Sequence, residues 1–243
     1  MPDDIPFKNR SEAGKLLAKQ LTTYAHRGDV VVLALPRGGV PVAYAVADAL
    51  GVELDILLVR KLGMPGQEEY AMGALGSGGV RVMQPGFPGL MGVTAQQVEA
   101  VAVREQAELE RRERLYRGSH PPADLRGRTV VLVDDGIATG SSMLVAVQVA
   151  RQLGAGKVVV AVPVAPPDTA ARMAAEVDQF VAVATPMAFR AVGQWYRRFD
   201  QTSDEEVQDL LARAWRGQAG QGAGAIDQPN QRTRHEPDDR HRT

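Results

Sequence analysis

The chain has 243 residues, of which 44% are hydrophobic and 23% charged, an ordinary composition for a globular protein with one sizeable core. Its formal net charge of -1 provides no overall attraction for nucleic acid or an anionic membrane. There is no apolar run near the roughly 20 residues of a membrane span, no secretory signal pattern at the start and no cysteine, so we expect a cytoplasmic chain without disulfides, membrane or nucleic-acid partners.

Most of the chain alternates between apolar stretches of strand length and stretches with helical periodicity. Helices are predicted over 11–27, 41–50, about 142–153 and from Asp168 onward. Strands are predicted over 31–35, 55–61, 129–135, 157–165 and 179–184. Strands that alternate with helices indicate an α/β fold with a mostly parallel sheet flanked by helices.

Two segments interrupt this alternation. A capping box at 94–97 begins a predicted helix that runs to about residue 117, within an insertion at about 80–120. Its charges predict a largely solvated surface helix with three pairs in the favourable i,i+4 order: Glu108 with Arg112, Glu110 with Arg114, and Glu113 with Arg117. Residues 187–215 contain aromatic residues and a second capping box, so we assign residues 1–216 to one domain and the polar residues 217–243 to a disordered tail.

The stretch VVLVDDGIATGSSM, residues 130–143, combines two kinds of binding group at one strand-to-helix junction. The amides and hydroxyls of residues 138–142 can surround a phosphate, because the first turn of a helix has unpaired N–H donors and a partial positive charge. Asp134 and Asp135 are suited to hydroxyl groups or a divalent cation, and Gly136 and Gly140 allow close backbone approach. A sugar phosphate with a free diol fits this junction; the alternative is a capped strand end that binds nothing.

This stretch resembles the phosphoribosyl-pyrophosphate (PRPP) signature of type I phosphoribosyltransferases. LPRGG, residues 35–39, resembles the pyrophosphate loop of that family. RKLGMPG, residues 60–66, resembles the start of the mobile catalytic loop of adenine phosphoribosyltransferases, with Met64 in place of a leucine. The resemblance covers roughly residues 5–212 and is strongest to a group whose base is not generally assigned. It implies a type I phosphoribosyltransferase fold with an inserted helix and a small C-terminal hood at about 187–215.

The resemblance also implies a reaction and a set of site residues. The reaction is Mg²⁺-dependent transfer of 5-phosphoribosyl from PRPP to a nitrogenous base, with release of pyrophosphate, as in nucleotide salvage. The implied PRPP-binding residues are Asp134, Asp135, Gly136, Ala138, Thr139, Gly140, Ser141 and Ser142, with Asp134 and Asp135 binding Mg²⁺ directly or through water. The implied pyrophosphate-binding residues are Arg37, Gly38, Gly39, Arg60 and Lys61, and the implied catalytic residues are Asp135, Arg37 and Lys61.

The chemistry of this reaction agrees with the implied residue types. Its transition state resembles an oxocarbenium ion, so an enzyme must stabilise the departing negative charge and exclude water. Mg²⁺ and the three cations Arg37, Arg60 and Lys61 can stabilise the charge, and a loop that moves at glycines 63, 66 and 73 can exclude water. The alternative for Arg60 and Lys61 is a pair of solvated charges at a strand end.

The acceptor is less well specified. Ala138 occupies the place where 6-oxopurine enzymes usually have an acid facing the purine, which disfavours hypoxanthine and guanine. The main candidates for base contact are Ile137, Trp195 and Phe199, and Tyr196 is a further aromatic candidate; core packing is the alternative for each of these aromatic residues. Many members of the family are dimers, so a homodimer is a further hypothesis. A non-catalytic module that senses PRPP or nucleotides is the alternative function, and the presence of Arg37 and Lys61 favours the enzyme.

Overall fold

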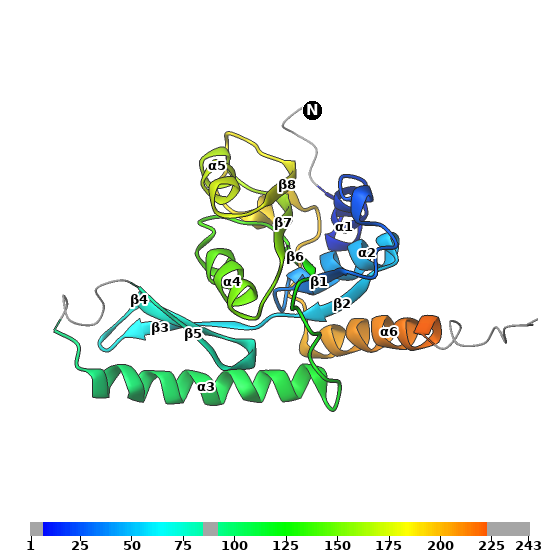
Figure 1. Ribbon diagram of the computed structural model, residues 1–243. Coiled ribbons are helices and arrows are strands. Elements are labelled where there is room, and N and C mark those ends of the chain that lie inside the picture. The colour runs from blue at the N-terminus through cyan, green and yellow to red at the C-terminus, as the bar shows by residue number, and fades with distance from the viewer. Residues whose placement is uncertain (1–6, 85–91, 223–243) are drawn as a thin grey trace, which may run out of the picture.

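A computed structural model describes residues 7–84 and 92–222. Within these residues, the core is a five-stranded sheet in the order β2-β1-β6-β7-β8, and all its strands are parallel (Figure 1). The strands are β1 (Val30–Ala34), β2 (Glu53–Ile56), β6 (Thr129–Val133), β7 (Lys157–Val164) and β8 (Gln179–Ala184). The predicted α/β class with a mostly parallel sheet is confirmed.

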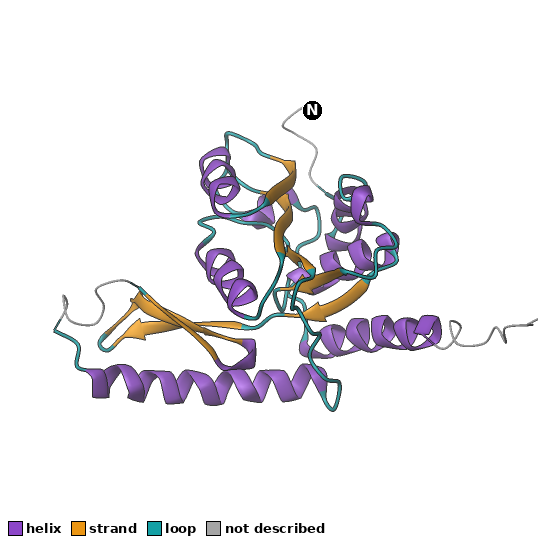
Figure 2. Ribbon diagram, viewed as in Figure 1, coloured by secondary structure: helices purple, strands orange, loops and turns teal. Residues whose placement is uncertain are grey.

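Helices cover both faces of this sheet (Figure 2). Successive residues of β1 point to opposite faces: Val30 and Val32 pack in one apolar cluster, and Val31 and Leu33 pack in another. The first cluster includes residues of α1 (Arg10–Ala18) and α2 (Gly39–Leu50), and the second includes residues of α4 (Ser141–Gln152) and α5 (Pro167–Glu176). Burial on both faces explains why the central strands are almost entirely aliphatic.

The opening helix is shorter than predicted. It ends at Ala18 instead of continuing to about residue 27, and Thr22–Tyr24 forms a separate 3-10 turn, η1. Leu21 and Tyr24 are nevertheless buried, at 0% and 3% exposure. The apolar spacing therefore predicted the buried side chains correctly, although the backbone that presents them is not one continuous helix.

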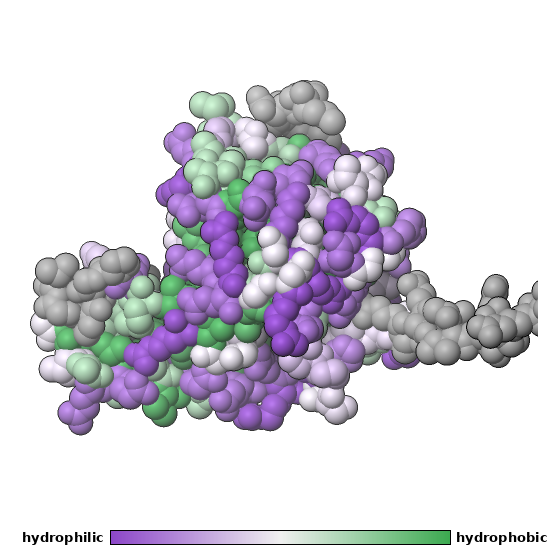
Figure 3. Space-filling view, in the orientation of Figure 1, coloured by the Kyte–Doolittle hydropathy of each residue, from purple (hydrophilic) through white to green (hydrophobic). Residues whose placement is uncertain are grey.

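An arm extends from the core (Figure 1). We define the arm as a three-stranded antiparallel sheet, β3 (Val59–Met64), β4 (Gln67–Gly76) and β5 (Val80–Met83), together with helix α3 (Ala95–Arg117). The prediction of one strand over 55–61 is wrong, because β2 ends at Ile56 and β3 begins at Val59. The residues predicted to begin a mobile loop lie in β3 and in the turn that leads to β4. In the space-filling view, hydrophobic residues come to the surface along the arm (Figure 3).

Helix α3 is less solvated than its charges predicted. The predicted capping box is present, with Gln97 N donating to Thr94 Oγ1 at 3.2 Å. One face of the helix is buried against the arm sheet and the core, through Val98, Val101, Ala102, Glu105, Leu109 and Tyr116. The prediction of a largely solvated helix is therefore wrong for this face. Its apolar residues are interleaved with many charged ones, so their helical periodicity is hard to detect in the sequence.

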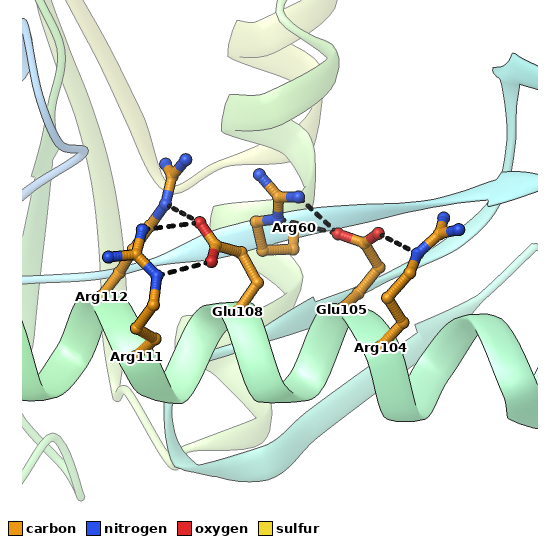
Figure 4. A network of polar contacts seen from close by, with 6 residues as sticks. All are labelled: Arg60, Arg104, Glu105, Glu108, Arg111 and Arg112. Carbon is orange, nitrogen blue, oxygen red and sulfur yellow. Dashed lines mark hydrogen bonds and ion pairs between the residues drawn. The ribbon is translucent and has the colours of Figure 1, made fainter.

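Two of the three predicted ion pairs of α3 are present. Glu108 pairs with Arg112 at 2.7 Å (Figure 4). Glu110 pairs with Arg114 at 3.8 Å. The predicted pair between Glu113 and Arg117 is wrong, because Arg117 pairs with Asp55 at the end of β2. The side chains of Arg117 and Asp55 are only 8% and 3% exposed, so this ion pair fixes the end of α3 to the core.

Helix α6 (Asp204–Gly222) begins after Ser203, and one of the two hydrogen bonds of the predicted second capping box is present, with Glu206 N donating to Ser203 Oγ at 3.1 Å. It packs beside α2, β2 and α3, and Trp215 Nε1 donates to Leu54 O at 3.0 Å. The helix continues beyond the predicted domain boundary at residue 216, and residues 223–243 of the predicted tail lie outside the described residues. Among the described helices, none is both long and apolar enough to cross a bilayer.

The buried ion pair between Arg117 and Asp55 leads to a prediction about the free energy of unfolding. Arg117→Ala leaves the Asp55 carboxylate buried without a cation, with two backbone donors, Ala123 N and Ile56 N, each at 2.8 Å, so we expect the free energy of unfolding to fall by about 3–5 kcal/mol. Arg114→Ala is the matched control on the same helix, because Arg114 is 71% exposed and its pair with Glu110 is 3.8 Å long; we expect a change within about 1 kcal/mol. Denaturant unfolding of both variants measures the difference. Similar small losses would contradict a structural role for the buried pair.

Candidate active site

The site is located between β1 and β6, where the chain connections from neighbouring strands run in opposite directions along the sheet. From β1 the chain passes to β2 on one side, and β6 lies on the other side of β1, with Ala34 and Val133 as paired residues at the ends of β1 and β6. The loops that follow β1 and β6 therefore leave the same sheet edge side by side, and Leu35 N donates to Val133 O at 2.9 Å. In open parallel sheets, ligands bind at such a switch point.

Asp134 and Asp135 lie at this point, directly after β6. Burial raises the pKa of Asp134 well above its ordinary value, and the nearby charge of Asp135 raises it further. Burial also raises the pKa of Asp135, while the positive charge of Arg10 opposes this rise. The two carboxylates therefore resist being ionised together. A cation, or hydroxyl groups that donate hydrogen bonds, would stabilise the ionised pair.

Arg10, at the start of α1, is the principal partner of Asp135. Its Nε and Nη2 atoms lie 2.9 and 2.8 Å from Asp135 Oδ2, and its Nη1 donates to Asp200 O at 2.6 Å. Its guanidinium carbon also lies 3.9 Å from the centre of the Phe199 ring. Sequence reasoning missed this residue. An arginine in the first turn of a helix has no distinguishing local pattern, and its partners are 125 and 190 residues away.

The loop after β1 packs directly against the acidic pair. A Cβ atom on Gly38 would lie 2.1 Å from Asp135 Oδ2, and one on Gly39 would lie 2.8 Å from Val133 O. Only glycine fits at these positions, so the two loops approach more closely than side chains would permit. The peptide bond between Pro36 and Arg37 is cis. The Arg37 side chain is 36% exposed, and its Nη1 lies 3.6 Å from Asp204 Oδ1 at the start of α6.

The loop after Asp135 leads into α4, which begins at Ser141, one residue before the predicted start. Gly140 is the N-cap, with φ 75°, and no side chain within the described residues caps this helix. The first amides of α4 are therefore available to an anion. The hydroxyls of Thr139 and Ser141 are 3.2 Å apart, and both residues are exposed.

Two side chains of helix α5 donate hydrogen bonds to the loop between Asp135 and α4. Thr169 Oγ1 donates to Ala138 O at 2.8 Å, and Arg172 donates to Thr139 O. These contacts occupy the carbonyl groups of the loop and leave its amides for other partners. We call residues 138–142 the phosphate cradle, after the phosphate-binding role that the sequence predicts for them.

The arm places its two predicted cations on opposite sides of β3. Lys61 is exposed and lines a groove of about 530 Å³ between the arm sheet and α4, where Ser141 of the phosphate cradle is also a lining residue. Arg60 instead donates from Nε and Nη2 to Glu105 Oε2 of α3, at 2.9 and 2.5 Å (Figure 4). The structure thus brings Lys61 toward the cradle and Arg60 away from it. The pyrophosphate-binding role of Arg60 stays a prediction.

The segment after β8 covers the acidic loop from the other side. Val192 lies so close to Gly136 that a Cβ atom there would be 2.6 Å from Val192 Cγ1. Tyr196 Oη donates to Asp135 O at 2.5 Å, a contact that sequence reasoning missed. This segment, together with Arg10, therefore fixes the position of Asp135.

The three candidate base-binding residues differ in exposure. Ile137 and Trp195 are 3% and 8% exposed and belong to apolar clusters. Phe199 is 37% exposed and packs against Arg10 and Tyr196. Phe199 is therefore the candidate with a free surface, and the contact of all three with a base stays a prediction.

Comparison with known proteins agrees with this geometry. The family model described as "Phosphoribosyl transferase domain" matches residues 8–185. The chain belongs to this phosphoribosyltransferase family. A "Putative phosphoribosyl transferase" of Mycobacterium tuberculosis strain H37Rv is 49% identical over 221 residues, which cover 91% of this chain and 49% of that protein. The chain spans about half the length of the curated relatives it matches.

A solved structure also resembles this phosphoribosyltransferase domain. The crystal structure of TT1426 from Thermus thermophilus is 45% identical, with a TM-score of 0.77, over 86% of this chain and 99% of that chain. The similarity therefore extends beyond the residues matched by the family model.

The residues of the site determine what kind of metal could bind. Among residues 7–84 and 92–222 there is no group of three or more His, Cys, Asp or Glu side chains arranged to hold a metal ion. Mg²⁺ is commonly held by only one or two carboxylates together with substrate phosphates and water. Asp134 and Asp135 are adjacent carboxylates and fit a Mg²⁺ site of this kind.

The close packing of the glycine loop against the acidic loop leads to a second prediction about stability. In Gly38→Ala the new methyl group would overlap Asp135 Oδ2, and relief of the overlap must either displace this carboxylate from Arg10 or move one of the two loops. We expect the free energy of unfolding to fall by about 1–3 kcal/mol. Gly28→Ala is the control, because its added Cβ would meet nothing within 4 Å, and we expect a change within about 0.5 kcal/mol. If denaturant unfolding shows the same change for Gly38→Ala and Gly28→Ala, the close contact at Gly38 does not contribute to the stability of the fold.

Proposed function

We propose that this domain transfers the 5-phosphoribosyl group of PRPP to a nitrogenous acceptor and releases pyrophosphate. The observation that carries the proposal is the order of binding groups along one sheet edge. The phosphate cradle, the acidic pair and the glycine loop of residues 36–39 follow one another there. This order matches the 5'-phosphate, the ribose hydroxyls and the 1-diphosphate of PRPP.

Each part of the proposed substrate has a group of suitable charge. The 5'-phosphate is bound by the amides and hydroxyls of Ala138, Thr139, Gly140, Ser141 and Ser142, and Gly136 allows the loop that leads to them to pack closely against Val192. The ribose hydroxyls donate to Asp134 and Asp135. Arg10 occupies only Oδ2 of Asp135, so its Oδ1 remains available to accept a hydrogen bond. The diphosphate is bound by the Arg37 side chain and by the loop backbone at Gly38 and Gly39, where Gly39 N would exchange its present acceptor, Leu35 O at 3.1 Å, for the ligand.

The reaction breaks the bond from the anomeric carbon to the diphosphate oxygen and forms a bond from that carbon to an acceptor nitrogen. Positive charge develops on the ribose as the diphosphate takes the bonding electrons. The acidic pair lies on the ribose side and stabilises this positive charge, whereas Arg37 and Lys61 stabilise the departing anion. Mg²⁺, when bound with PRPP at Asp134 and Asp135, neutralises phosphate charge.

The proposed acceptor site is the space beside Ile137, covered by the segment that follows β8. Ala138 is exposed but has no group that exchanges a proton with a base. This favours acceptors other than hypoxanthine and guanine. The partly exposed ring of Phe199 offers a stacking surface for a flat heterocycle, and Arg10 behind it strengthens that surface through a cation–π contact.

Two substitutions test the assigned roles. Arg37→Ala removes the mobile cation of the glycine loop, so we expect turnover to fall by about 100-fold, because the departing charge loses a partner. Its pair with Asp204 is long and exposed, so the free energy of unfolding should change by less than about 1 kcal/mol. Asp135→Asn should lower turnover by a similar factor. Steady-state kinetics and denaturant unfolding are measured on the same preparations. A loss of stability in Arg37→Ala that is large enough to explain its lower turnover would contradict the role of Arg37. Asp135→Asn also weakens the buried contact with Arg10, so its role is judged from the turnover of the folded protein, and unchanged turnover there would contradict it.

The acceptor and the choice between enzyme and sensor require a separate experiment. Purines, pyrimidines and related bases are each incubated with PRPP and Mg²⁺ while pyrophosphate release is followed, and binding of PRPP alone is measured by calorimetry. Release with one class of base supports the transferase. Binding of PRPP without release on any base would favour the non-catalytic sensor.

A further inference from the structure

Asp204 is an acidic residue at the edge of the proposed diphosphate site. It is the first residue of α6, and its Oδ1 atom has two neighbours from different parts of the chain. Tyr116 Oη of α3 donates to it at 2.7 Å, and Arg37 Nη1 of the glycine loop lies 3.6 Å away. One carboxylate oxygen thus links the arm helix to the cation that is proposed to hold the diphosphate.

Local structure fixes the position of this carboxylate. The start of α6 is held by the Ser203 cap, through Glu206 N at 3.1 Å and Val207 N on Ser203 O at 3.2 Å. Tyr116 is 4% exposed, so its ring cannot move far. Asp204 therefore remains beside Arg37 whether or not a ligand is present.

The pair with Arg37 is poorly suited to stabilising the fold or orienting the guanidinium. Its single contact is 3.6 Å long, and the two side chains are 36% and 41% exposed. Exposed pairs of this kind contribute little to stability, and one long contact does not fix a planar five-donor group. The lasting effect of Asp204 is its negative charge, which lies close to any anion that Arg37 binds.

We propose that Asp204 competes with pyrophosphate for Arg37 and thereby weakens the binding of the diphosphate group, so that the product leaves sooner. The inference rests on the proposed function, because it needs Arg37 to bind that group. When the diphosphate is bound, Arg37 turns from Asp204 to the ligand. When pyrophosphate departs, the guanidinium returns to the carboxylate.

Tyr116 moderates this competition. Burial raises the pKa of Tyr116 to about 12, and its hydrogen bond to Asp204 adds to the rise, so the hydroxyl stays a neutral donor. That donated hydrogen bond reduces the negative charge that Asp204 Oδ1 presents to Arg37 and to the ligand. Tyr116→Phe keeps the buried ring and removes the donor. The variant should therefore strengthen the competition, which is the opposite of the effect of removing the carboxylate charge.

The test is a calorimetric titration with inorganic pyrophosphate and Mg²⁺. Asp204→Asn should bind pyrophosphate about three- to tenfold more tightly than the unchanged protein, the size of one like-charge contact at a partly exposed site. Tyr116→Phe should bind it about twofold more weakly, and the double variant should match Asp204→Asn alone. The gain of Asp204→Asn should shrink as salt rises, because the contact is solvent-accessible.

Asp209→Asn is the matched control. It removes one carboxylate from an exposed position on the same helix and should leave pyrophosphate binding unchanged. Thermal unfolding of each variant establishes that the fold is retained. An Asp204→Asn variant that is folded and binds pyrophosphate equally well or more weakly would overturn the inference. If neither pyrophosphate nor PRPP binds to any variant or to the unchanged protein, the proposed function itself is overturned.

Discussion

The parallel pairing of β1 with β6 is the constraint on which the site depends. Every residue of both strands is buried, so their register is fixed by packing on two faces. Because Ala34 is paired with Val133, the glycine loop and the acidic loop start at the same level. A slip of one residue would exchange the faces of the strand and separate Gly38 from Asp135. The packing of β1 and β6 in the hydrophobic core thus sets the distance between the glycine loop and the acidic loop.

The charged groups of the site are balanced by partners outside the predicted motifs. Asp135 is paired with Arg10 of α1, and Arg37 with Asp204 of α6. The first pair is the more buried, with 12% and 15% exposure, and has two short contacts to one oxygen. It can hold Asp135 in place while a ligand binds to the other oxygen. The second pair is long and exposed, so it can be exchanged for a contact with a ligand.

Sequence patterns predicted the parts of the protein that depend on neighbouring residues. The central strands, the helix after the acidic loop and the caps at Thr94 and Ser203 follow from hydrophobic runs and local capping rules, and the ends of the elements differ from the predicted ones by a few residues. The residues of the PRPP-like motif lie at one strand-to-helix junction, as predicted. Their ligand-binding roles remain predictions.

Local sequence patterns did not predict the contacts between residues that are far apart in the chain. The arm sheet was missed because its glycine-containing strands have weak alternation and a register shift beside Gly63. Arg117 illustrates the same limit: its sequence offers Glu113 at helical spacing, but a buried Asp55 on another element binds it. Arg10 and Tyr196 support Asp135 from segments that are 125 and 61 residues away. No local rule identifies partners at such separations.

The attachment of the arm limits how the site can close. The end of α3 is fixed to β2 by the buried pair of Arg117 with Asp55 and is linked to α6 by Tyr116. The root of the arm sheet is held as well, since Leu58 N donates to Ser77 Oγ at 3.0 Å and Gly76 packs against Val149 of α4. Motion of the whole arm would break these contacts. The mobile loop predicted to begin at residues 60–66 therefore begins in a strand that is paired with β4, and its motion stays a prediction.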